Sequence, residues 1–134
     1  MKWMLDTDTC IAIIKGKPPS VLKKLRSKSV GQVGISSITL GELAFGAAKS
    51  GRRDESRAAL AEFLLPLEIA SFDSDAASSY GQVRASLEKR GTPIGPLDTL
   101  IGAHAVALDV VLVTHNRREF GRLDTLRVED WTSS

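Results

Sequence analysis

The sequence is poor in cysteine and in long apolar runs. Its 134 residues include one cysteine, Cys10, so an intrachain disulfide and a cysteine-based zinc site are both excluded. No apolar stretch comes near the roughly 20 residues that a membrane-spanning helix requires. The first residues, MKWMLDTD, reach acidic side chains too early for the apolar region of a secretory signal peptide. We therefore expect a protein of the reducing cytoplasm with no membrane association.

Acidic residues are missing from one long segment. Between Thr9 and Gly41 there is none, although the net charge of the whole chain is only +2. Two interpretations of this basic segment stay open: a solvated helix face, or a surface that attracts phosphate groups through counterion release. The cations of the segment are Lys15, Lys17, Lys23, Lys24, Arg26 and Lys28.

Apolar residues follow two alternating spacings along the chain. Short apolar runs predict strands at residues 2–5, 32–36, 67–72, 110–114 and 126–130. Helical spacing predicts helices at residues 9–16, 18–28, 37–51, 54–65, 73–91 and 97–109. Alternating strands and helices predict an α/β fold. We expect one domain over residues 1–134, a three-layer α/β/α sandwich with a largely parallel central sheet of about four to five strands.

Acidic residues stand where predicted strands end and helices begin. Asp6 follows the first predicted strand, and Thr114 ends the fourth, at the carboxyl edge where parallel sheets bind ligands. Glu42 lies in a helix among apolar residues. Asp98 falls in the first turn of a helix that begins at Pro96. Taken singly, Glu42 is also consistent with an exposed helical glutamate, and Asp98 with capping at the positive helix end.

Together these carboxylates predict a metal-dependent chemistry. Acids that converge at one dry end of a sheet raise each other's pKa unless a cation neutralises them. Oxygen ligands select a hard cation, Mg²⁺ or Mn²⁺, rather than zinc. A carboxylate-bound Mg²⁺ lowers the pKa of its water and stabilises charge on an attacked phosphate. We therefore expect phosphoryl chemistry at Asp6, Glu42 and Asp98.

One short motif suggests a phosphatase. Asp6-Thr7-Asp8 resembles the first motif of haloacid-dehalogenase-like phosphatases, in which the first acid is a nucleophile and the second a general acid/base. Cys10 stands where that motif has Thr or Val, and the later segment VVLVTHNRREF lacks the paired acids that this family needs. The phosphatase is therefore the alternative hypothesis.

A second resemblance covers nearly the whole chain. It rests on MLDTDTCIAIIKGKP, ISSITLGELAFGAAKS, KRGTPIGPLDTLIGAHAVALDVVLVTHNRREFGRL and LRVEDW. In order and spacing, these segments resemble VapC-type PIN-domain ribonuclease toxins of type II toxin–antitoxin systems. The resemblance implies a PIN-like fold and a Mg²⁺- or Mn²⁺-dependent endoribonuclease that cleaves structured RNA such as tRNA. It also implies a homodimer and a cognate antitoxin, whose C-terminal segment covers the active-site groove of a toxin–antitoxin hetero-oligomer.

The resemblance assigns roles to the three core acids. Asp6 and Asp98 would be the principal metal ligands, and Glu42 would help to hold the metal or orient the attacking water. A non-catalytic PIN-like binding module is a third hypothesis. We rank it last because all three acids are present.

Two positions depart from the pattern of the family. Many relatives have asparagine where this chain has Asp8, so Asp8 is either an outer ligand or a turn residue. Many also carry a fourth acid at the position of Asn116. Glu119, three residues later, would replace that acid or cap the following turn.

Charge and position suggest further contacts at the edge of the site. Thr114 and Asn116 belong to its periphery with Asp8 and Glu119. His104, in an apolar helix, is expected to be a packed histidine rather than a ligand. Possible RNA contacts are Lys15, Lys17, Arg84 and His115.

Overall fold

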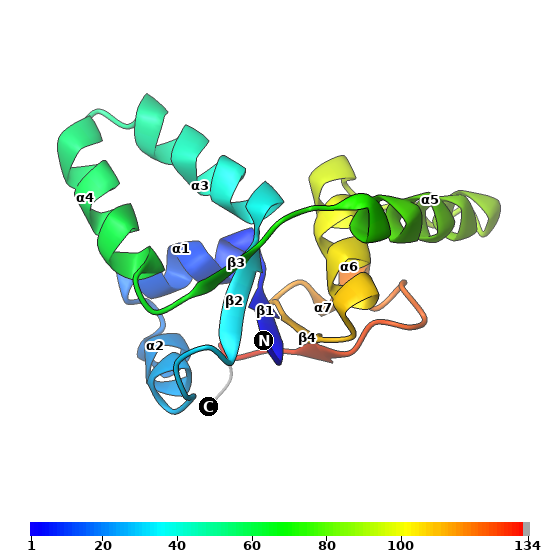
Figure 1. The fold of residues 1–134 in the computed structure, drawn as a ribbon, viewed down its shortest axis with the longest axis horizontal. Coiled ribbons are helices and arrows are strands. Elements are labelled where there is room, and N and C mark those ends of the chain that lie inside the picture. Colours follow the sequence, from blue (N-terminus) through cyan, green and yellow to red (C-terminus); the bar gives the residue numbers. More distant parts are fainter. Residues whose placement is uncertain (133–134) are drawn as a thin grey trace.

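The computed structural model describes residues 1–132 as strands and helices that alternate along most of the chain (Figure 1). The strands are β1 (Trp3–Leu5), β2 (Val33–Ser36), β3 (Glu68–Ala70), β4 (Val111–Val113) and β5 (Val128–Glu129). The helices are α1 (Thr7–Lys15), α2 (Pro19–Arg26), α3 (Ser37–Lys49), α4 (Arg53–Leu64), α5 (Ser74–Lys89), α6 (Pro96–Leu108) and α7 (Arg117–Phe120). Among these residues, no helix combines the length and the apolar composition needed to cross a lipid bilayer.

The five strands form one parallel sheet in the order β3-β2-β1-β4-β5. The chain builds outward from β1 through β2 to β3, and then returns to place β4 on the other side of β1. The strand order therefore reverses between β1 and β4, where Leu5 is paired with Val113. In open α/β sheets, this reversal opens a crevice at the carboxyl ends of the strands. Asp6 and Thr114 immediately follow the two strands that flank it.

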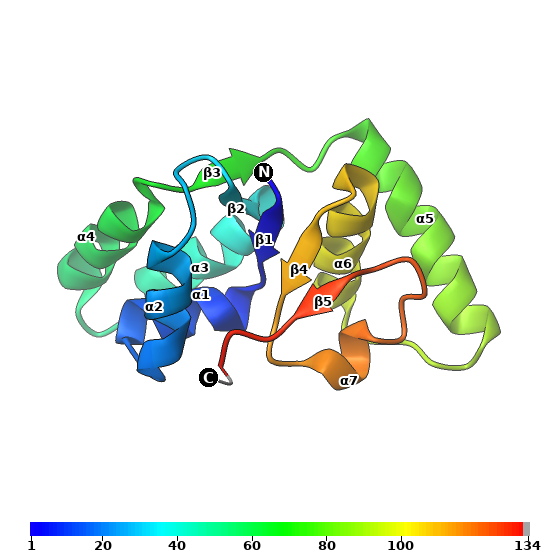
Figure 2. The ribbon, with the colours of Figure 1, turned by 90° about the horizontal axis from the view of Figure 1, so that it is seen from below.

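Helices cover both faces of the sheet, which confirms the predicted three-layer sandwich. On one face Leu5, Ile35 and Val113 pack with residues of α1 and α2 such as Ile13 and Val21. The other face contributes Met4 and Leu112 to a second core, together with Ile101 and Ala105 of α6 and Phe120 of α7. Helix α5 packs across α6, on the outer side of that layer (Figure 2).

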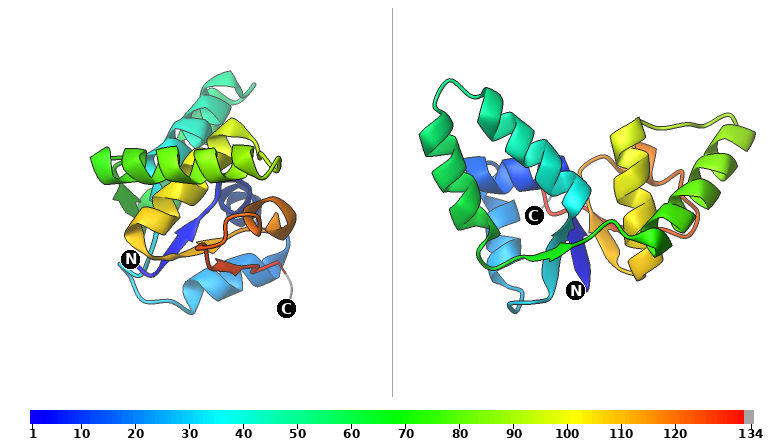
Figure 3. Two further views of the ribbon diagram at one scale, coloured as in Figure 1. Left: turned by 90° about the vertical axis from the view of Figure 1, so that its right-hand side faces the viewer. Right: turned by 45° about the horizontal axis from the view of Figure 1, so that its top comes forward.

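Two pairs of helices extend beyond the central strands. Helices α3 and α4 pack together as one arm, and α5 and α6 form the other (Figure 3). Both α3 and α6 begin near the carboxyl edge of the sheet, so the first turns of these two helices lie near the ends of β1 and β4 (Figure 1).

Local capping explains where the helices begin. Ser36 and Asp73, which are among the expected caps, accept hydrogen bonds from the backbone N–H groups of Ile38 and Ala76. Helix α6 begins at Pro96 after Gly95, as expected. Helix α1 starts at Thr7, two residues before its predicted start.

The sequence pattern also missed α7. Four residues, Arg117–Phe120, are too few to display a helical spacing of apolar side chains.

A pair of indole rings fixes the last strand to the first. Trp3 and Trp131 donate their Nε1–H groups to the two carboxylate oxygens of Glu129, over 3.2 and 3.1 Å. The Nζ atom of Lys28 lies 4.0 Å from the centre of the Trp3 ring. Partial burial acts to raise the pKa of Glu129, but the two indole donors and the charges of Lys28 and Lys24 outweigh it and hold that pKa below its usual value.

We expect Glu129→Gln to destabilise the protein by about 1–3 kcal/mol at pH 7, because an amide offers one acceptor oxygen to two indole donors. Folding lowers the pKa of Glu129. The ionised side chain therefore adds to the free energy of unfolding above the unfolded pKa, and this stabilisation is lost as the pH falls through the folded pKa. Urea unfolding at pH 7 and pH 3 should therefore show that the difference in free energy of unfolding between wild type and Glu129→Gln shrinks on acidification. A difference independent of pH would contradict this explanation. Glu62→Gln, at an exposed helical position, is the control.

Candidate active site

Asp6 is buried at the end of β1. Its carboxylate accepts the backbone N–H of Thr9 over 2.8 Å and so caps α1, which is why that helix starts earlier than predicted. Burial raises the pKa of Asp6, although hydrogen bonds from Thr114 and Thr9 partly offset this effect. Thr114, at the end of β4, is fully buried beside it. The structure thus brings together the two residues that the sequence placed at neighbouring strand ends.

Glu42 reaches the same edge of the sheet from the second turn of α3. Its Oε1 atom accepts a hydrogen bond of 2.6 Å from the hydroxyl of Thr7, the residue that follows Asp6. A single residue therefore links the first two acids of the site. The sequence reasoning missed Thr7, and the only signal that could have revealed it is the hydroxyl directly after the strand-ending acid.

Asp98 completes the convergence from the first turn of α6. Burial, followed by the neighbouring Glu119 and then the charges of Asp6 and Glu42, raises the pKa of Asp98 to about 6. The negative charges of the other three side chains thus act on Asp98, although they come from β1, α3 and α7. The four carboxylates converge where the strand order reverses.

The two candidates for a fourth polar position act as a pair. Asn116 caps α7 by accepting the backbone N–H of Glu119, and its Nδ2 atom donates a hydrogen bond of 2.9 Å to Glu119 Oε2. Glu119 is half-buried and acts on Asp98, whereas Asn116 orients it. Asp8 is exposed in the first turn of α1, and its charge is the smallest of the influences that raise the pKa of Asp6.

The chemistry of these donors fits a hard divalent cation. Carboxylate and amide oxygens are ligands of Mg²⁺ and Mn²⁺, and no cysteine or histidine is among them. Within residues 1–132, however, the acids do not form a compact group of three or more ligands around one point.

The basic residues suggested as RNA contacts lie in different surroundings. Lys15 and Glu42 line the same surface pocket of about 540 Å³, between α1, α3 and α4. His115 lies beside Asp130 and Thr132, with its Nδ1 atom 3.2 and 3.0 Å from their side-chain oxygens. The other two are exposed: Lys17 follows α1, and Arg84 is paired with Glu88 on α5. Of these four residues, Lys15 is the one that shares a described pocket with a core acid.

His104 is a packed histidine, as expected, and it also connects the two arms. Its Nδ1 atom lies 2.8 Å from the hydroxyl of Ser36, the residue that caps α3. Burial lowers the pKa of His104, which favours the neutral ring. Because α3 carries Glu42 and α6 carries Asp98, this buried contact helps to set the positions of the two helices relative to each other.

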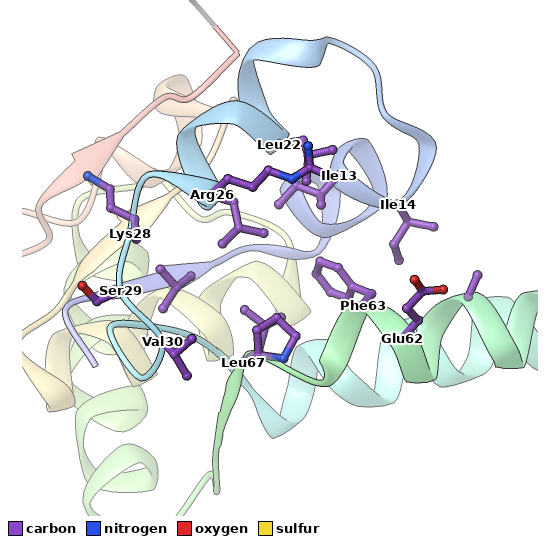
Figure 4. Close-up of a pocket in the computed structure, with 14 residues that line it drawn as sticks. Ile13, Ile14, Leu22, Arg26, Lys28, Ser29, Val30, Glu62, Phe63 and Leu67 are labelled. Carbon is purple, nitrogen blue, oxygen red and sulfur yellow. The ribbon is translucent and has the colours of Figure 1, made fainter.

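A second concave surface lies away from the four acids, between α1, α2 and α4 (Figure 4). Its volume is about 540 Å³ and its walls are mostly apolar. Leu22 of α2 and Phe63 of α4 contribute to opposite sides, and Val30 lies at the edge. Arg26 and Lys28 add positive charge, and Glu62 adds one acid.

Comparison with known protein families assigns the chain as a whole to a family. The family model described as PIN domain matches residues 3–126. The match extends far beyond the Asp6-Thr7-Asp8 motif, on which the phosphatase hypothesis depends. The chain therefore belongs to the PIN-domain family.

Individual relatives show which type of PIN-domain protein this chain resembles. A tRNA(fMet)-specific endonuclease VapC from Salmonella typhimurium is 44% identical over 98% of both chains. A solved structure of DNA-bound VapBC from the same species has a TM-score of 0.93, with 98% of both chains covered. VapBC2 from Rickettsia felis, solved with a promoter DNA fragment, gives 38% identity and a TM-score of 0.92 over 98% of this chain and 99% of that one. Within the PIN family, this chain is of the VapC ribonuclease type, as the sequence resemblance indicated.

The raised pKa of Asp98 has a consequence for the stability of the metal-free protein. Folding raises this pKa to about 6, so the associated stability is present below the unfolded pKa and is lost as the pH rises through about 6. We expect Asp98→Asn, which cannot ionise, to be more stable than wild type by about 1–2 kcal/mol at pH 7.5 in EDTA. The difference should vanish near pH 4.

Urea unfolding of the two proteins across this pH range measures the effect. Asp75→Asn removes an exposed acid from the first turn of α5 and serves as the control. A metal-free Asp98→Asn protein that is less stable than wild type at pH 7.5 would show that the carboxylates do not repel one another.

Proposed function

We propose that this protein is a Mg²⁺- or Mn²⁺-dependent endoribonuclease, and that Asp6, Glu42 and Asp98 form its catalytic centre with Glu119 as the fourth acid. Two findings together carry the proposal: the match to the PIN domain over residues 3–126, and the position of half-buried Asp98, where the charges of Asp6, Glu42 and Glu119 act on it and, with burial, raise its pKa. Such mutual repulsion is a cost to folding that a bound divalent cation would remove.

Each acid has a role that follows from its surroundings. Asp6 is fixed by Thr9 and Thr114 and, with Asp98, would hold the cation. Glu42, oriented by the Thr7 hydroxyl, would align the attacking water and accept its proton. The water oxygen would bond to phosphorus as one P–O ester bond breaks, and the leaving ribose oxygen would take up a proton from solvent. When bound, the cation would supply Lewis-acid activation of the water and neutralise charge on the phosphodiester.

The proposed substrate is tRNA, and initiator tRNA in particular. This proposal rests on the 44% identical relative from Salmonella typhimurium, which is described as a tRNA(fMet)-specific endonuclease. The chain would act in the cytoplasm, where its substrate is found.

Asp6→Asn, Glu42→Gln and Asp98→Asn should each reduce Mg²⁺-dependent cleavage of initiator tRNA by roughly 10²–10³-fold, because each removes a charged group from the reacting centre. Gel analysis of labelled RNA measures the loss, and Asp75→Asn is the matched surface control. Three folded variants that cleave at the wild-type rate would disprove the site assignment. Hydrolysis of a generic phosphomonoester without RNA cleavage would favour the phosphatase.

The apolar pocket between α1, α2 and α4 is the proposed docking site for an antitoxin. Two solved relatives are VapBC complexes, and the sequence resemblance implies an antitoxin whose C-terminal segment reaches the active-site groove. Apolar side chains of another part of the antitoxin would fill this pocket, which lies away from the four acids, and acidic ones would meet Arg26 and Lys28 at its wall. A homodimer remains an expectation from the same resemblance.

Val30→Asp should weaken binding of the cognate antitoxin at least about tenfold, because it puts a charge at the edge of an apolar contact. Leu65→Asp is a close control, since Leu65 is 83% exposed against 85% for Val30 and does not line that pocket. Isothermal titration of the two variants gives the comparison. Equal affinities would place the antitoxin elsewhere.

A further inference from the structure

A small basic pocket lies on the other side of α2 from the apolar one. It has a volume of about 460 Å³ and is formed where α2 faces the start of α7 and the residues that follow Val128. The C-terminal segment passes between α2 and α7 (Figure 2). We call it the α2/α7 pocket. Its lining residues are Ser20, Lys23, Lys24, Ser27, Arg117, Glu129, Asp130 and Trp131.

Within the described residues, the cations of the α2/α7 pocket form no close ion pair, although the charge of Lys24 acts on Glu129. Lys23, Lys24 and Arg117 are exposed, and in residues 1–132 none of them lies within 4.0 Å of a carboxylate. The sequence explains this for α2, because no acid occurs between Thr9 and Gly41. Three positive side chains, from two elements about 90 residues apart in the chain, therefore surround one concavity with their hydrogen-bond donors unused.

The two acids in the wall of the pocket are occupied by other groups. Both oxygens of Glu129 accept indole N–H groups, from Trp3 and Trp131. One oxygen of Asp130 accepts the backbone N–H and the hydroxyl of Thr132, and the other lies 3.2 Å from His115 Nδ1. Each of these four carboxylate oxygens therefore already has a partner, whereas Lys23, Lys24 and Arg117 have no carboxylate within 4.0 Å in residues 1–132.

We propose that the α2/α7 pocket binds a backbone phosphate of the RNA substrate, at a position away from the cleaved bond. Lysine and arginine together are the usual protein partners of phosphate, the first as a point charge and the second as a planar donor. A volume of about 460 Å³ also lies within the range of sites that enclose small groups. This inference rests on the proposed ribonuclease function.

One short segment connects the pocket with the four acids. Thr114 lies at Asp6, and Asn116 orients Glu119. Arg117 comes directly after Asn116 and lines the α2/α7 pocket. An RNA strand held by Arg117 on one side of this segment would thus have a neighbouring phosphate presented to the carboxylates on the other.

The test measures binding separately from cleavage. Anisotropy of labelled initiator tRNA is recorded with full-length protein that carries Asp98→Asn, in Mg²⁺, over a range of salt concentrations. In this background, Lys23→Gln/Lys24→Gln should weaken binding roughly tenfold and reduce the slope of log K against log salt by about 1, the value for one lost phosphate contact. Arg117→Gln should weaken binding too, with a smaller change in slope.

A matched double variant controls for the loss of overall charge. Arg53→Gln/Arg57→Gln removes two exposed arginines from α4, which also lack a carboxylate within 4.0 Å in the described part of the chain. It should leave the affinity and the salt slope nearly unchanged. Circular dichroism melting confirms that every variant is folded.

The possible outcomes distinguish a failure of the pocket proposal from a failure of the proposed ribonuclease function. If the control weakens binding as much as the pocket variants do, or if the pocket variants bind tRNA normally, the pocket proposal is wrong. If the pocket variants lose affinity only for duplex DNA or for antitoxin, it is also wrong. If wild type cleaves no RNA but tRNA binding depends on Lys23, Lys24 and Arg117, the proposed function fails and the pocket assignment stands.

Discussion

Repulsion between carboxylates at the end of the central sheet is the constraint on which the rest of the site depends. Asp98 carries its consequence, a pKa raised to about 6 by burial and by three neighbouring acids. The fold moderates the repulsion by placing three of the four acids at helix N-termini, where the backbone dipole is positive. Asp6 caps α1, Asp98 lies in the first turn of α6, and Glu119 lies in the first turn of α7. The helix starts that bring these acids together therefore also stabilise their negative charges.

The strand order explains why these particular residues meet. The chain reverses direction across the sheet between β1 and β4, so Asp6 and Thr114 leave neighbouring strands at the same edge. The arms then bring in Glu42 from α3 and Asp98 from α6, and buried His104 joins them through the hydroxyl that caps α3. Small polar contacts between helix starts, rather than one long element, define the geometry of the site.

Much of the fold and of the candidate site was predictable from local sequence patterns. The features that were not predictable share one physical reason. Apolar spacing gave the alternating strands and helices, and the strand-ending position of Asp6 gave the edge where the acids gather. Thr7 was missed, and the role of Glu119 was left open between a fourth acid and a turn cap, because each depends on a partner distant in the chain, Glu42 and Asp98 respectively. The link between Trp3, Glu129 and Trp131 was also invisible, since it joins the two ends of the chain across the sheet.

An anionic substrate must approach a site that is itself made of acids. Positive charge near the site is therefore needed to offset the repulsion. The net charge of +2 is too small to attract RNA by itself. Attraction must come from local concentrations of cations, and the absence of acids between Thr9 and Gly41 provides one. Lys15, at the end of α1, shares a pocket with Glu42, while α2 turns Lys23 and Lys24 toward Arg117. Since Asp6 caps α1 and Lys15 ends it, one short helix positions both a proposed catalytic acid and one of the cations that compensate for the acids.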